Sequence, residues 1–201
     1  MTYPAFFDQA PSIVVHDRLA QFLGAFSDGL ITYRYLDAVR LAGHSCPTVA
    51  GAYLMTRRAL QLLYPDAIAE RGALQVQFSA AQDEGVTGVI AGVIGLITGA
   101  AGAGGFKGIG GDFRRQNLMH FGFDADAEVR FERSDSGACV RLGMQMNRVP
   151  AEPGVAAALQ KIRSGQAAPE ELAHFAALWQ ERVRRILTDH ADDPELIVRA
   201  E

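Results

Sequence analysis

The sequence predicts a single α+β domain in which an antiparallel sheet of about four or five strands packs against helices. Two observations carry this prediction. Apolar residues recur with the period of a helix in several segments, and they alternate with polar residues in others, as in half-buried strands. The chain has 201 residues, of which 49% are hydrophobic and 21% charged. It can therefore bury one sizeable core, and we expect residues 1–201 to form one folded domain.

Helices are expected where apolar residues line up behind a residue that can cap or start a helix. Asp17 can cap the first of them, and Pro47 suits the first position of a long helix whose N-cap would be Cys46. Gly29 and Gly43 break the pattern after the early helical segments. The expected helical segments cover residues 17–26, 37–41, 47–63, 85–99, 155–162 and 169–186.

Strands are expected where apolar and polar side chains alternate. The segment 74–78 reads Leu-Gln-Val-Gln-Phe, which is typical of a half-buried strand. The segments 119–123, 129–131 and 140–144 continue the pattern, and a Ser-Asp-Ser-Gly turn joins the last two in a hairpin or meander. From Asp189 onward the composition indicates a polar tail.

The segment 85–106 carries no charged residue, and its length would suit a membrane span. Its last third is too rich in glycine for a continuous helix, since each glycine costs about 1 kcal/mol relative to alanine. We therefore expect a buried helix over 85–99 and disfavour a membrane span. Four glycines at positions 88, 92, 95 and 99 form a small-residue groove, which suggests a homodimer.

Net charge and cysteine content bear on which partners and which cellular location to expect. The net charge is −4 and no basic stripe exists, so nucleic acid is not an expected partner. Arg114 and Arg115 could gather an anion, but adjacent arginines after a turn are expected at a solvated edge. Cys46 and Cys139 lie far apart without CxxC spacing, and the start of the chain lacks a charged-then-apolar leader. A reducing cytoplasm is the expected location.

The most informative segment places an imidazole and a thiol two residues apart at the start of a helix. His44 and Cys46 are both ligands for borderline metals, and the positive potential of a helix N-terminus favours a thiolate. Zinc fits this pair best, although nickel or iron would also accept it. The alternative is a buried cysteine that acts as a small hydrophobe beside a hydrogen-bonded histidine.

Two ligands do not complete a metal site, so a third is needed. Asp37 is the best candidate, because it precedes His44 by seven residues, or about two helical turns. An aspartate that opens a helix can also serve as a cap. Asp83, Glu84 and His120 are further candidates. Lys107 follows a glycine-rich turn, where it could project its ammonium group toward an anionic ligand or cofactor.

Several motifs match one family. Gly43 to Pro47 read Gly-His-Ser-Cys-Pro, and Thr98-Gly99 is followed by a glycine and lysine-containing turn around Lys107. A segment of the form Ser-Gly-x-Ala-x-Pro-Glu-Glu begins at Ser164. From about residue 36 to 187 the chain resembles the core domain of the FmdE family, which comprises a component of formylmethanofuran dehydrogenase and its stand-alone bacterial relatives. Ala42 and Thr48 replace a histidine and a glycine that are common in that family, and nothing after Cys139 could form the zinc ribbon of some members.

Three functions follow from these observations. The resemblance implies a small metal-binding protein, in which His44 and Cys46 hold zinc or a similar metal. Asp37 is the candidate third ligand from its spacing, and a coordination position would stay open for a small ligand. The first alternative is a metal-free thiol enzyme with Cys46 as nucleophile and His44 as general base. The second alternative is a noncatalytic assembly protein that docks on a larger complex.

Overall fold

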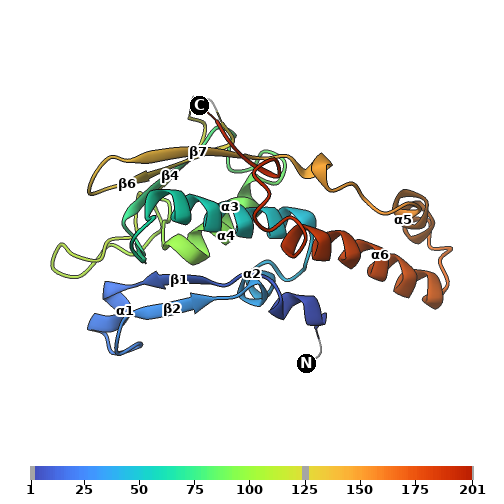
Figure 1. The fold of residues 1–201 in the computed structure, drawn as a ribbon, viewed down its shortest axis with the longest axis horizontal. Helices are drawn as coiled ribbons and strands as arrows, with labels where there is room; N and C mark the ends of the chain where they lie inside the picture. Colours follow the sequence, from blue (N-terminus) through green and yellow to red (C-terminus); the bar gives the residue numbers. More distant parts are fainter. Residues whose placement is uncertain (1–2, 124–126, 201) are drawn as a thin grey trace.

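Two β-sheets enclose a central layer of helices (Figure 1). The structure, a computed structural model, describes residues 3–123 and 127–200. The helices α3 (Pro47–Leu63) and α4 (Thr87–Thr98) pack on each other in the middle layer. The predicted α+β class with a sheet of about five strands is confirmed.

Both sheets are mixed rather than purely antiparallel. The smaller sheet has the order β2-β1-β3 and the larger has the order β5-β4-β6-β7-β8. The parallel pairs are β1 with β3 and β4 with β5, and helices lie within both connections, as parallel strands require a long crossover. The strands are β1 (Ile13–His16), β2 (Leu30–Tyr33), β3 (Ala69–Glu70), β4 (Leu74–Phe78), β5 (Met119–His120), β6 (Val129–Arg133), β7 (Cys139–Met144) and β8 (Ile197–Arg199).

The remaining helices surround this core. In Figure 1, α5 and α6 project from the body as a helical hairpin, and only the last turns of α6 reach the core through Val183, Ile186 and Leu187. Pro47 and Pro169 occupy the first turns of α3 and α6, as expected. These helices are α1 (Arg18–Phe22), α2 (Tyr35–Ala42), α5 (Val155–Arg163) and α6 (Pro169–Leu187), with 3-10 turns η1 (Ala5–Asp8) and η2 (Met146–Arg148).

The main core lies between α3 and the larger sheet. In β4 the apolar side chains at 74, 76 and 78 are buried, whereas the two glutamines between them are half-buried. This alternation confirms the predicted strand. Phe131 and Leu142 extend the buried face onto β6 and β7, and each such side chain contributes about 1.5–3 kcal/mol through its burial.

The first predicted helix is shorter than its periodicity suggests. Asp17 caps α1 as expected, by accepting hydrogen bonds from the backbone N–H groups of Leu19 and Ala20. The helix then ends at Phe22, because Gly24 adopts a left-handed conformation with φ +72° and turns the chain. Phe22 and Phe26 are consequently exposed instead of buried.

The end of the chain contributes to the larger sheet. The segment from Asp189 is polar in composition, but β8 pairs with the free edge of β7. Leu196 and Ile197 are buried there. Their burial and the hydrogen bonds of a sheet edge together explain why this segment folds back instead of remaining a solvated tail.

The apolar segment before the glycine-rich loop forms a helix of only 12 residues, α4, which ends at Gly99 with φ +73°. Ile90, Val93 and Ile94 on one face are buried, whereas Gly88 and Gly92 on the other are exposed. Among the described residues, no helix has both the length and the hydrophobicity needed to cross a bilayer.

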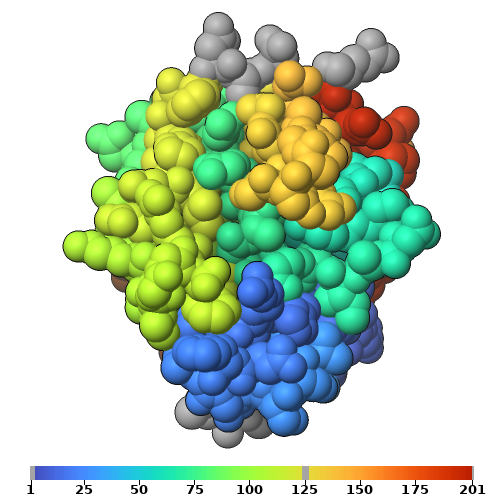
Figure 2. All heavy atoms as spheres, turned by 90° about the vertical axis from the view of Figure 1, so that its left-hand side faces the viewer, coloured from blue at the N-terminus to red at the C-terminus, as the bar shows by residue number. Residues whose placement is uncertain are grey.

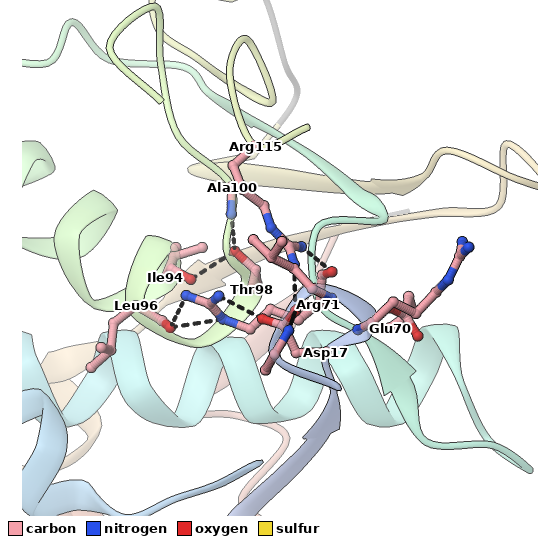
Figure 3. Close-up of polar contacts among 11 residues, drawn as sticks. Asp17, Glu70, Arg71, Ile94, Leu96, Thr98, Ala100 and Arg115 are labelled. Carbon is pink, nitrogen blue, oxygen red and sulfur yellow. Dashed lines mark hydrogen bonds and ion pairs between the residues drawn. The ribbon is translucent and has the colours of Figure 1, made fainter. Parts of the chain in front are cut away.

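A buried ion cluster joins the smaller sheet to the loop that follows α4 (Figure 3). The carboxylate of Asp17, 3% exposed, accepts from Arg71 Nη1 at 2.8 Å and from Arg115 Nη2 at 2.7 Å. Arg71 also donates to the carbonyl oxygen of Leu96, near the end of α4. The prediction that Arg115 lies at a solvated edge is wrong: the residue is 7% exposed, because its side chain turns inward to pair with Asp17.

Candidate functional site

The segment between α2 and α3 is fixed at both ends by the helices. Gly43 adopts φ +75° and its N–H donates to the carbonyl of Val39, which ends α2. Cys46 is the N-cap of α3, as predicted, and its Sγ accepts from the backbone N–H of Val49 at 3.5 Å. Cys46 is half-buried, and neither it nor Cys139 forms a disulfide bond in the described structure.

Ser45 anchors this segment to α2 and α6. Its hydroxyl donates to Gln180 Oε1 at 3.0 Å, so the Tyr35 hydroxyl, 2.9 Å away, must be the donor in the second bond. The Ser45 carbonyl accepts from Trp179 Nε1 and Gln180 Nε2, both at 3.1 Å. Burial raises the pKa of Tyr35 well above its usual range, which keeps this phenol a donor.

Sequence reasoning missed this anchor. Ser45 occupies the variable position of the Gly-His-x-Cys-Pro pattern, and Trp179 lies 134 residues away on α6. The one available signal in the sequence was that the single tryptophan falls on the apolar face of a predicted helix. Such a position indicates core packing rather than a hydrogen bond. Only the tertiary contact reveals that α6 holds the segment in place.

His44 is exposed and its tautomer is set by its neighbour. Nδ1 lies 2.9 Å from the carbonyl oxygen of Ala42, which can only accept, so Nδ1 carries the proton. With the proton on Nδ1, Nε2 is the ring nitrogen that can accept a hydrogen bond. His44 lines a cavity of about 260 Å³ whose other lining residues are apolar or glycine. They are Leu41, Ala42, Gly88, Val89, Gly92 and Val93.

The predicted metal-binding function is wrong. Within residues 3–123 and 127–200, no group of three or more His, Cys, Asp or Glu residues could hold a metal ion. Asp37 is instead used as a cap: Oδ2 accepts from the Arg34 N–H at 2.8 Å and Oδ1 lies 3.5 Å from Arg40. His44 and Cys46 therefore lack a third ligand.

The other proposed ligands belong to different parts of the fold. His120 lies in β5, where its Nε2 is 3.3 Å from Gln75 Oε1. Glu84 accepts from the N–H of Ala81 in the exposed turn that also contains Asp83. Each side chain is engaged in local structure or exposed, and none completes a site with His44 and Cys46.

Lys107 is exposed in the loop between α4 and β5. The predicted need for positive φ in this turn is confirmed at Gly108, where φ is +96°. His44 lies against the first half of α4, whereas Lys107 follows the other end of that helix. The structure thus does not bring the two predicted site residues into one cavity.

No protein-family model matches the chain, and no curated protein matches it either. The resemblance to the FmdE family therefore stays a prediction.

Proposed function

We propose that this chain is a small-molecule-binding protein, a divergent relative of the family that it resembles, and that its ligand occupies the cavity between α2 and α4. One observation carries the proposal: an apolar cavity contains a single imidazole whose tautomer is fixed, so that Nε2 is available as an acceptor. Apolar walls with a few well-placed polar groups are typical of ligand sites.

The cavity limits the chemistry of the ligand. A volume of about 260 Å³ lies just below the usual range of ligand pockets, so the ligand is small. Gly88 and Gly92 leave the helix backbone uncovered and let an apolar or planar group approach closely. Since His44 Nε2 accepts, the ligand needs one hydroxyl or N–H donor. A compact molecule such as a phenol meets these requirements.

Binding fits the geometry better than thiol catalysis does. A nucleophilic Cys46 would have to reach the ligand that His44 contacts. The cavity is lined by His44 but not by Cys46, whose Sγ is turned to the N–H of Val49 and packs beside the core. We therefore assign the thiol a capping role.

The predicted homodimer belongs to the same proposal. The rim of the cavity carries exposed apolar side chains, with Leu41 at 52% and Val89 at 37% exposure. A second copy that packs on this face would cover them and shield the ligand from water. Sedimentation equilibrium should give a dimer mass for the wild type and a monomer mass for Val89→Glu. A monomeric wild type at high micromolar concentration would refute the dimer.

Methyl NMR spectra with phenol as the probe test the proposed ligand site, and toluene serves as a ligand of similar shape without a donor. We expect phenol to shift the Leu41 and Val89 methyl resonances saturably. His44→Leu should weaken phenol binding about fivefold, the value of one hydrogen bond, and leave toluene unaffected.

His174→Leu is the matched control, because His174 is an exposed histidine on α6. It should bind phenol like the wild type. Absence of saturable shifts at millimolar phenol, or equal losses in both histidine variants, would overturn the proposal.

A further inference from the structure

A second cavity, of about 130 Å³, lies between the start of α1, the β3–β4 turn and the loop that follows α4. On this face the N-terminal segment and that loop lie side by side (Figure 2). Their contact includes the rings of Phe22 and Phe113, which stack with centroids 5.2 Å apart. The lining residues are Arg18, Glu70, Arg71, Gly72, Ala73, Phe113, Arg114 and Arg115.

The surroundings of this cavity carry an excess of positive charge. Four arginines line it. In the described part of the chain, Glu70 is the one carboxylate in the lining and Asp17 is the one carboxylate that pairs with the lining arginines. Two positive charges remain. Both carboxylates are already engaged, because Asp17 accepts from two arginines and Glu70 accepts from His16 Nδ1 at 2.6 Å and from the Arg18 N–H at 3.1 Å.

Arg115 is the buried member of this set. Nη2 donates to Asp17 and Nη1 donates to the Arg71 carbonyl, but Nε is buried without an acceptor among the described residues. Gly72 leaves room for the Arg115 side chain, since a Cβ at position 72 would overlap Arg115 Nη1. Burial removes the Arg115 guanidinium from solvent, which penalises its charged form and lowers its pKa. A negative charge in the adjacent cavity would offset that penalty.

Arg18 and Arg114 stand at the mouth of the cavity. Both are exposed, and neither pairs with a carboxylate in the described segments. Arg114 Nε donates to the carbonyl of Gln116, and the Arg18 guanidinium lies 5.7 Å from the centre of the Phe113 ring. Their remaining N–H groups are free to bind an oxyanion in the forked geometry that arginine favours.

We propose that this cavity binds a phosphate group, either inorganic phosphate or the phosphate of a small monoester. A phosphate monoester carries between about 1.5 and 2 negative charges at pH 7, which matches the excess of two positive charges. The cavity has room for several water molecules, and therefore for a compact tetrahedral anion. The exposed Phe22 ring and its partner Phe113 offer an apolar surface for an organic substituent.

Isothermal titration calorimetry tests this site with inorganic phosphate and with phenyl phosphate as probes, at constant ionic strength and pH 7.5. We expect saturable binding of one phosphate per chain. Arg18→Gln and Arg114→Gln should each weaken binding about tenfold, as expected for a hydrogen bond between charged groups. Both residues are exposed, so these variants are expected to keep the fold.

The matched control is Arg163→Gln, which removes an exposed arginine from α5. It should bind phosphate like the wild type. Tighter binding of phenyl phosphate supports a monoester ligand that uses the phenylalanine pair, and equal affinities support the free anion. Absence of binding at 20-fold molar excess and millimolar concentration, or the same loss in Arg163→Gln, would overturn the proposal.

Discussion

Two glycines in α4 give a sharp test of the structure, because alanine should have opposite effects at the two positions. Gly92 faces the cavity, and a Cβ built there would lie 3.8 Å from Leu41 Cδ2, an ordinary contact. At Gly95 a Cβ would lie 2.9 Å from the carbonyl oxygen of Ala100. That oxygen belongs to the backbone just after the left-handed Gly99 and cannot rotate away.

The magnitudes follow from these contacts. Replacing glycine by alanine within a helix stabilises it by about 1 kcal/mol, so Gly92→Ala should raise the free energy of unfolding by that amount. At Gly95 the same gain is opposed by an overlap that costs about 1–3 kcal/mol. We therefore expect Gly95→Ala to lower the free energy of unfolding by about 1 kcal/mol and the two variants to differ by about 2 kcal/mol.

Urea unfolding measures both effects, with far-UV circular dichroism and the fluorescence of the single tryptophan as probes. Coincident transitions would support two-state analysis. Equal stability of Gly92→Ala and Gly95→Ala would refute the packing described for α4. A further consequence concerns the cavity: Gly92→Ala should bind phenol more weakly while being more stable, which separates loss of binding from loss of fold.

Three further changes test the ion cluster, a histidine pair and the N-cap. Asp17→Asn leaves the buried Arg115 and the half-buried Arg71 without a carboxylate and should lower the free energy of unfolding by about 3 kcal/mol in urea titrations; a loss below about 1 kcal/mol would contradict the cluster. The hydrogen bond with Glu70 raises the pKa of His16 above 6.5, so its stabilisation is complete below pH 6.5 and is lost as the pH rises through the folded-state pKa. The stability difference between wild type and His16→Gln should therefore shrink between pH 6 and pH 8.5, and a constant difference would argue against the pair. Cys46→Ser retains an acceptor for the N–H group of α3 and should be at least as stable as wild type, whereas Cys46→Ala should lose about 1 kcal/mol; equal thermal midpoints for the two variants would exclude the capping role.

The elements that sequence patterns predicted well are those whose signal is local. The helix α3 begins at Pro47 with Cys46 as its cap, and β4 alternates buried and half-buried residues. The strands β1 and β2 carry no such signal, because four residues are too few for a distinct period. Each becomes a strand through pairing with the other, and β3 joins them from 54 residues further along the chain.

The candidate site shows the same limit. The adjacency of His44 and Cys46 and the capping position of Cys46 can be read from the sequence. The identity of the residues around His44 cannot, because the wall of its cavity comes from α4, more than 40 residues later. Asp37 failed as a predicted ligand because a carboxylate three positions into a helix can satisfy a backbone N–H close to it.

The sequence alone determined the fold class, the long helices and the local chemistry at the start of α3, because periodicity, capping and turn formation depend on neighbouring residues. Tertiary structure decided which side chains meet. Trp179 anchors the segment between α2 and α3 that contains His44, and Arg115 is buried against Asp17 instead of lying at the surface. Contacts of this kind join residues about 100 or more positions apart, and their energies depend on burial and geometry that arise only when the layers pack.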